Sequence, residues 1–124
     1  MGKRPDGGRL LKTFIQTLWI ALIAAAVLFL PTMAYAADIT MGSGGNLVFE
    51  PNEITISAGE TVTFTNGDLP PHNMIVDGHP ELSHGDLAFA AGDTFDVTFP
   101  EAGDYSFQCD PHAGAGMKGI IHVN

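Results

Sequence analysis

Residues 94–109 read TFDVTFPEAGDYSFQC, and they carry the pattern that decides the fold. Apolar and polar side chains alternate on both sides of a turn sequence, Ala102-Gly103-Asp104. Strict alternation over four to eight residues is typical of strands with one buried face. The apolar positions are Phe95, Val97 and Phe99 in the first run and Tyr105, Phe107 and Cys109 in the second. Two short strands are therefore expected, and the side chain of Cys109 should point into the core at the end of the second.

The same alternation appears in TVTFT at 61–65 and in the last residues of the chain, while no segment keeps a helical period. Turn sequences separate the runs at 58–60, 66–68 and 91–93. Short strands at this spacing predict a single all-β domain, a sandwich with Greek-key connections and antiparallel strands. Residues 77–90 are the least strand-like, and a short helical turn is expected within 81–88.

The first 36 residues differ in composition from the rest. Residues 1–12 hold four of the five basic residues, and residues 18–30, LWIALIAAAVLFL, have no polar side chain. Ala34-Tyr35-Ala36 then offers small residues at the two positions that a signal peptidase reads. This order predicts a helical signal peptide over 1–36 and a mature domain over 37–124. A retained membrane anchor is the alternative, although the apolar run is shorter than the roughly 20 residues that span a bilayer.

The predicted mature domain is strongly acidic. Of 14 acidic residues only Asp6 precedes residue 37, and of 5 basic residues only Lys118 follows it, which leaves 13 carboxylates, one lysine and a formal charge of −12. Such a surface argues against nucleic acid or an anionic membrane as partner and favours a protein with a basic docking face. Adaptation to solubility or salt is the alternative explanation.

Cys109 is the only cysteine, so no disulfide can form within the chain. A single thiol in an exported protein either serves as a ligand or, if it is exposed and free, is open to oxidation and dimerisation. The segment that follows, CDPHAGAGM at 109–117, adds an imidazole at His112 and a thioether at Met117. Two glycines permit the tight turn that brings these groups together, and Pro111 stiffens the approach to the imidazole.

A second imidazole comes from His72, and the preceding Pro70 and Pro71 restrict its loop. Two imidazoles and a thiolate, with a weak axial methionine, form a type 1 blue-copper site that transfers electrons. The sequence therefore predicts one copper ion per chain. Its ligands would be His72, Cys109, His112 and Met117.

Zinc and nucleophilic catalysis fit these residues less well. Zinc gains little from a thioether, and a structural zinc site closes with a fourth Cys, His or carboxylate. A catalytic thiolate must be reachable by substrate, whereas Cys109 is expected inside the domain and is closely followed by Pro111. The chain has no HExxH motif or Gly-rich phosphate loop. We therefore predict no enzyme activity.

The remaining histidines are expected outside the metal site. His122 has the opposite parity to its apolar neighbours and should face solvent, while His79 and His84 lie in the irregular segment and are expected at the surface. Met74 is expected to pack in the core.

Residues 105–123, YSFQCDPHAGAGMKGIIHV, resemble the copper loop and last strand of the plastocyanins, type 1 copper proteins of the cupredoxin class. The resemblance continues through LVFEP at 47–51, PHN at 71–73 and ELSHGDLAF at 81–89, the last similar to the short-loop cyanobacterial type. It implies an eight-stranded Greek-key cupredoxin sandwich or barrel and a mobile, monomeric carrier of single electrons.

The resemblance also implies partners and site residues. The electron donor would be cytochrome f of the cytochrome b6f complex and the acceptor photosystem I, in the thylakoid lumen. The four ligands carry over as given above, with Asn73 tethering the two ligand loops beside Pro111. His112 would be the exit for the electron. A docking patch of mostly apolar residues surrounds it and comprises Leu47, Pro70, Pro71, His112 and Ala115.

Two positions depart from the family pattern. Gln108 stands where plastocyanins commonly have tyrosine, which removes the aromatic ring of a second electron entry route. Ala113 stands where cyanobacterial members often have arginine, so one basic contact with a partner is missing. Negative charge is spread out rather than gathered in the compact acidic runs of plant plastocyanins. Docking is therefore expected to differ more than copper chemistry.

Three other functions are alternatives. A related blue-copper carrier would serve a respiratory or oxidative chain in a bacterial periplasm, and cellular context is the main difference from the photosynthetic carrier. A copper oxidase or reductase needs a second copper site, for which two spare clustered histidines do not suffice. A copper storage or delivery protein uses several exposed Met, His or Cys residues, whereas this predicted site is single and closed.

Overall fold

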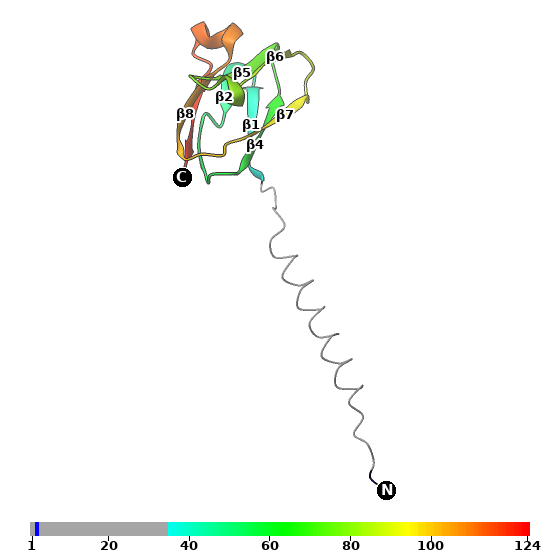
Figure 1. Ribbon diagram of the computed structural model, residues 1–124. Helices are drawn as coiled ribbons and strands as arrows, with labels where there is room; N and C mark the ends of the chain where they lie inside the picture. Colours follow the sequence, from blue (N-terminus) through cyan, green and yellow to red (C-terminus); the bar gives the residue numbers. More distant parts are fainter. Residues whose placement is uncertain (1, 3–34) are drawn as a thin grey trace. The chain divides into compact units, whose positions relative to one another are not determined.

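The computed structural model describes residue 2 and residues 35–124. The predicted signal peptide and its helix lie outside these described residues, except for Gly2, Tyr35 and Ala36. The described residues form nine strands and two short 3₁₀ segments (Figure 1). In chain order these are β1 (Tyr35–Ser43), β2 (Asn46–Glu50), β3 (Glu53–Ile56), β4 (Thr61–Asn66), β5 (His72–Val76), η1 (Pro80–Leu82), β6 (His84–Ala88), β7 (Thr94–Thr98), β8 (Gly103–Gln108), η2 (Asp110–Ala115) and β9 (Lys118–Val123).

The strands form two sheets, which confirms the predicted all-β sandwich. One sheet has the order β2-β1-β4-β7 and the other the order β3-β9-β8-β5-β6. Two neighbouring pairs, β1 with β4 and β3 with β9, are parallel, and the remaining pairs are antiparallel. The expected arrangement was entirely antiparallel. Parallel neighbours arise because the chain crosses to the other sheet before it returns, as Greek-key connections require.

The described strands number nine rather than the expected eight. The difference lies at Pro51 and Asn52, which separate β2 in the first sheet from β3 in the second. Proline has no N–H to donate to a sheet ladder, so pairing stops there and the chain changes sheets. β2 and β3 therefore act as two halves of one strand that bends around the edge of the sandwich.

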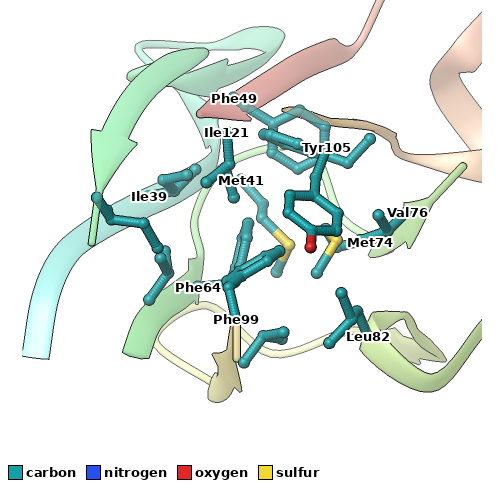
Figure 2. Close-up of a cluster of buried hydrophobic side chains, with 14 of the residues drawn as sticks. Ile39, Met41, Phe49, Phe64, Met74, Val76, Leu82, Phe99, Tyr105 and Ile121 are labelled. Carbon is teal, nitrogen blue, oxygen red and sulfur yellow. The ribbon is translucent and has the colours of Figure 1, made fainter. Parts of the chain in front are cut away.

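The core lies between the sheets, where the alternating side chains meet. Figure 2 shows Ile39 and Met41 of β1, Phe64 of β4 and Ile121 of β9 in this cluster, and all four are fully buried. Tyr105, Phe107 and Cys109 are buried as their shared parity predicts. Burying such side chains contributes about 1.5–3 kcal/mol each, which makes this core the main source of stability.

The end of β8 is held in place by aromatic packing just before Cys109. The ring of Phe107 lies edge-on to Phe49 at a centroid distance of 4.7 Å and to Phe64 at 5.9 Å. Gly119 lies against the other side of Phe107, where a Cβ would collide with the ring and with the carbonyl of Asn52. This close packing fixes where the chain leaves the core and enters the metal-binding loop.

Residues 81–88 contain less helix than expected. The helical turn is η1, and it ends at Leu82, which is buried. From His84 the chain is a strand, β6, paired with β5. Tertiary pairing with β5 therefore overrides the weak local pattern of this segment. Within residues 2 and 35–124, no helix has the length and apolar character needed to cross a membrane.

Candidate metal centre

The predicted ligands meet at one end of the sandwich. His72 is the first residue of β5, Cys109 follows β8, His112 lies in η2 and Met117 directly precedes β9. Figure 1 shows η2, in orange, at the end of the sandwich opposite the C-terminus. His72, Cys109 and Met117 are fully buried, and His112 is half-buried. Residues distant in the sequence are thus brought to one point just inside the surface.

The donor atoms are spaced as a single metal ion requires. Cys109 Sγ lies 3.8 Å from His72 Nδ1 and 3.5 Å from His112 Nδ1, and the three donor atoms all lie within 4.8 Å of one another. Bond lengths of about 2.3 Å to sulfur and 2.0–2.1 Å to nitrogen place such atoms about 3.8 Å apart around a trigonal metal ion. The donor set therefore fits one first-row transition metal. Among residues 2 and 35–124, no other group of three His, Cys, Asp or Glu side chains converges in this way.

The ring of His72 is oriented by the backbone behind it. Its Nε2 lies 2.6 Å from the carbonyl oxygen of Asp68. A carbonyl only accepts hydrogen bonds, so Nε2 carries the proton and Nδ1 keeps its lone pair facing Cys109. A partner of this kind fixes both the tautomer and the direction of a metal-binding histidine before the ion arrives.

Gly42 supports the same hydrogen bond from the end of β1. Its carbonyl accepts the amide of Asp68 at 2.7 Å. Gly42 has φ +77°, and a Cβ there would collide with the Asp68 carbonyl and lie 2.6 Å from His72 Nε2. Only glycine leaves room for the backbone to approach a ligand ring so closely.

Asn73 joins the two ligand loops and the neighbouring strand. Its side-chain oxygen accepts the amide of Asp110 at 2.9 Å, and its side-chain nitrogen donates to the carbonyl of Gly85 at 3.1 Å. Asn73 is only 4% exposed. The side chain of Asn73 therefore connects β5 to the segment after Cys109 and to β6.

The loop that carries the other three donors is closed at its base. The amide of Cys109 donates to the carbonyl of Met117 at 3.1 Å, and the amide of Met117 donates to the carbonyl of His112 at 3.2 Å. Gly116 completes the turn in the left-handed region, at φ +86°. Pro111 occupies the first turn of η2, where its missing N–H is not needed.

The electrostatics of the pair Cys109 and His112 favour neutral side chains until a metal ion binds. Burial raises the pKa of the Cys109 thiol, an effect that the backbone N–H groups of Asn73 and His112 partly offset. Burial and the neighbouring His72 lower the pKa of His112. At neutral pH the site therefore offers the unprotonated imidazole of His112, while the thiol proton must leave when a metal ion binds.

The family model for copper-binding proteins of the plastocyanin and azurin type matches residues 36–124. The chain belongs to the plastocyanin/azurin family. It is 42% identical over 111 residues to chloroplastic plastocyanin of Hordeum vulgare, a match that covers 82% of this chain and 72% of the relative. Plastocyanin of Scenedesmus fuscus is 44% identical over 97 residues, covering 69% of this chain and 99% of the relative.

Solved structures agree with this assignment. Oxidized plastocyanin from Dryopteris crassirhizoma superposes with a TM-score of 0.64 and 34% sequence identity, covering 71% of this chain and all of that chain. The expected family and cupredoxin fold are thus confirmed. The protein is a copper-binding electron carrier and not an enzyme.

The other histidines lie outside the cluster, as the sequence predicted. His122 is partly exposed, with Nδ1 2.7 Å from Asp104 and Nε2 2.8 Å from Glu53. His79 pairs with Glu81 at 2.8 Å. His84 of β6 stacks on Phe95 of β7 with ring centroids 3.9 Å apart, a contact between edge strands of the two sheets. Met74 is fully buried in the core, also as expected.

The residues of the docking patch differ in exposure. Pro70 and Ala115 are exposed, whereas Leu47, Pro71 and His112 are half-buried. The sequence interpretation missed three residues around the site. Asp68 and Gly42 act through their backbone atoms. For Gly42, the only signal in the sequence was a glycine placed before a loop, and Asp68 gave none. Leu69 is 50% exposed and directly precedes Pro70. An apolar residue in the loop before His72 was a signal in the sequence that could have identified it.

Proposed function

We propose that His72, Cys109, His112 and Met117 hold one copper ion, and that the protein shuttles single electrons between two redox proteins of photosynthesis. The convergence of two imidazole nitrogens on the buried Cys109 sulfur, 3.8 and 3.5 Å away, supports the ligand assignment most strongly. Copper bound there supplies a one-electron Cu(II)/Cu(I) couple. A carboxylate or fourth His or Cys, which zinc would prefer, is not within the cluster in the described residues.

Fast electron transfer requires that the ligands move little when the charge changes. His72 is held by Asp68, Cys109 by the backbone of Met117, and the two loops by Asn73. These hydrogen bonds hold the ligand side chains and their loops in one geometry, which can serve both oxidation states of a bound ion. Complete burial of Cys109 and Met117 keeps water from the sulfur atoms.

The proposed partners are cytochrome f as donor and photosystem I as acceptor, and the proposed location is the thylakoid lumen. The similarity to plastocyanins named as chloroplastic supports this choice over a periplasmic respiratory chain. His112 would transfer the electron through its half-exposed ring, surrounded by the docking patch. A small, mostly apolar patch on an acidic protein suits brief encounters with a basic partner.

We also propose export by a signal peptide over 1–36 and a mature protein over 37–124. Cleavage after Ala36 removes the first two residues of β1 and leaves its pairing with β4 from Ala37 and Val62 onward. The intact mass of the protein recovered from its compartment tests this boundary. A mass that includes residues 1–36 would instead indicate a retained anchor.

The first experiment is a titration of the purified protein with Cu(II), followed by ascorbate, monitored by visible absorption. We expect an intense blue band that saturates at one copper per chain and is bleached by the reductant. A folded protein that stays colourless would contradict the ligand assignment.

The photosynthetic assignment is tested separately, by rapid mixing with the reduced soluble domain of cytochrome f. We expect a second-order rate that falls as salt is added, because a chain with a formal charge of −12 over 37–124 is steered by a basic partner. Slow, salt-independent oxidation of cytochrome f would favour the periplasmic alternative.

A further inference from the structure

Asn66 and Gly67 form the only Asn-Gly pair in the chain, and they lie where β4 ends. In an exposed, flexible chain this pair is especially prone to deamidation, because glycine has no side chain to hinder its own backbone nitrogen. That nitrogen forms a bond to Cγ of the asparagine, and the amide group leaves as ammonia with the proton of the glycine N–H. Water then opens the resulting five-membered succinimide ring to aspartate or isoaspartate.

The folded domain engages both groups that this reaction needs. The amide nitrogen of Gly67, which would attack, donates to the carbonyl of Met41 at 2.9 Å. The side-chain nitrogen of Asn66, which would leave, donates to the carbonyls of Ala88 at 3.2 Å and Ala90 at 2.9 Å. Asn66 is also only 1% exposed, so water has little access to it. The labile pair is therefore protected while these contacts are in place.

Packing explains why the chain keeps such a labile pair. Two carbonyl oxygens face the side chain of Asn66, and a carbonyl only accepts hydrogen bonds, so this position needs a side chain with two N–H donors. The next position needs glycine, because a Cβ on Gly67 would collide with the carbonyl of Gly42 in β1. Each requirement is structural, and together they place the two residues in the order that deamidates readily.

The other side-chain atom of Asn66 shows why the product would not fit. Oδ1 is buried without a hydrogen-bond partner, and no other buried side-chain nitrogen or oxygen in residues 2 and 35–124 lacks one. An ionised aspartate would turn one carboxylate oxygen toward the carbonyls of Ala88 and Ala90, and its other oxygen would stay unpaired. A buried charge without a partner is very costly, because it loses its hydration and gains nothing in return. The closed structure therefore rejects the deamidated residue.

The metal centre depends on the same segment, because residues 67–71 connect β4 to β5. The carbonyl of Asp68 lies 2.6 Å from His72 Nε2, and the amides of Gly67 and Asp68 donate to carbonyls of β1. Isoaspartate adds one carbon atom to the backbone between residues 66 and 67, which would shift both amides away from their acceptors. Either product thus loosens the connection that orients His72.

We propose that Asn66 is a protected deamidation site, and that its conversion prevents the connection at 67–71 from closing on β1. The site reacts when this connection separates from β1 and from the segment that follows β6, and the reaction requires no reagent other than water. Because the products do not revert to asparagine, the modification records the time that a molecule has spent open. This inference goes beyond the proposed function, since it concerns the lifetime of the domain.

The first experiment measures aspartate and isoaspartate at position 66 by peptide mass mapping and isoaspartate-specific methylation. The purified native protein, with and without Cu(II), is incubated at mildly alkaline pH beside the same protein kept unfolded in guanidinium chloride. Asn52 is the internal control, because it is exposed in the folded domain and its access to water changes little on unfolding.

We expect deamidation at Asn66 to be at least about tenfold slower in the native protein than in the unfolded chain, since a tenfold ratio corresponds to about 1.4 kcal/mol of opening free energy. The rate at Asn52 should differ much less between the two states. Equal rates at Asn66 in native and unfolded protein, or no conversion in the unfolded chain, would overturn the inference.

Copper should slow the native reaction further, an expectation that rests on the proposed ligand role of His72. Strong protection by folding that is the same with and without copper would retain the inference and count against that ligand role. Failure of the proposed function is thereby distinguished from failure of the protected site.

The second experiment tests the consequence of conversion. After graded incubation in denaturant, the fraction of wild-type protein that refolds should fall in step with conversion at Asn66. Asn66→Asp should lower the folding equilibrium constant by about tenfold or more, because it places an unpaired charge in a buried position. Asn52→Asp, which adds the same charge at an exposed position, should have little effect. Full refolding of converted chains, or equal stability of Asn66→Asp and Asn52→Asp, would overturn the inference.

Discussion

Cys109 contributes the only sulfur that can form a short covalent bond to copper in the proposed site, so colour depends on this residue. We predict that Cys109→Ser abolishes the intense blue band, because the band comes from the thiolate bond that a hydroxyl cannot replace. Visible absorption of the copper-loaded variant measures it. Met74→Leu is the matched control, since Met74 is an equally buried sulfur outside the cluster, and it should keep full colour. A blue Cys109→Ser protein would remove Cys109 from the ligand set.

At the scale of single residues, the sequence singled out three side chains that converge in the folded domain: His72, Cys109 and His112. A thiol, two imidazoles and a thioether are chemically rare, and His112 and Met117 follow Cys109 at a short fixed spacing. The carbonyl of Asp68 could not be predicted, since every residue has a carbonyl and only the folded loop shows which one faces His72. Gly42 was missed for the same reason, because its role is to leave space.

The side chain of Asn73 links β5 to η2 and adds a hydrogen bond to β6, which is also paired with β5 through the backbone. We predict that Asn73→Ala lowers the free energy of unfolding by about 1–3 kcal/mol, because the amide of Asp110 and the carbonyl of Gly85 lose a part-buried partner and a buried side chain is removed. Denaturant unfolding measures the change. Asn52→Ala, at an exposed position, is the control and should stay within about 0.5 kcal/mol of wild type. Equal stability of Asn73→Ala and wild type would show that Asn73 is not a structural tether.

His122 connects three strands on the outer face of the five-stranded sheet. Its ring bridges Asp104 of β8 and Glu53 of β3, and these hydrogen bonds raise the pKa of His122. A raised native-state pKa means that the folded protein holds the proton more tightly than the unfolded chain does. The resulting stabilisation is complete below the unfolded pKa of about 6.5 and is lost as the pH rises through the higher native pKa.

We therefore predict that His122→Gln destabilises the protein more at about pH 6 than at about pH 9. Denaturant unfolding at the two pH values gives the difference. The double variant Glu53→Gln, Asp104→Asn should remove the same pH dependence while it keeps the histidine. A destabilisation by His122→Gln that is equal at both pH values would show that the ring acts through packing alone.

At the scale of elements, alternation predicted the long strands, because burial on one face imposes it. The split between β2 and β3 was not predicted, since an alternating run does not show which sheet each half joins. β6 was expected to be partly helical because Gly85 and Asp86 carry little strand preference, and its pairing with β5 decided otherwise. The exposure of Phe89, which directly follows β6, is likewise visible only once β6 is placed at a sheet edge.

Across the whole domain, nearly all the charged side chains are negative. The 13 carboxylates of residues 37–124 face a single lysine, Lys118, which directly follows the proposed ligand Met117. A nearby positive charge disfavours the more positive Cu(II) state of a bound ion. We predict that Lys118→Gln lowers the reduction potential and that Lys118→Glu lowers it further, as redox titration would measure.

Lys118→Arg is the control and should preserve the potential, since it keeps the charge and the exposed position. High salt should reduce the differences among the variants, because Lys118 is exposed and its field is screened. Identical potentials in the Gln, Glu and Arg variants would show that solvent already screens this charge completely.

The hydrogen bond between the amide of Cys109 and the carbonyl of Met117 has a consequence for how such domains diversify. It closes residues 110–116 into a loop whose two ends are held together at the edge of the sheet, while Asn73 of β5 holds the first residue of that loop. Insertions or deletions inside this loop would alter the spacing of His112 and the shape of the surface around it without shifting β8 or β9. Exchange of this one short loop can thus change the absorption spectrum and the choice of partner, while the two sheets keep the same fold.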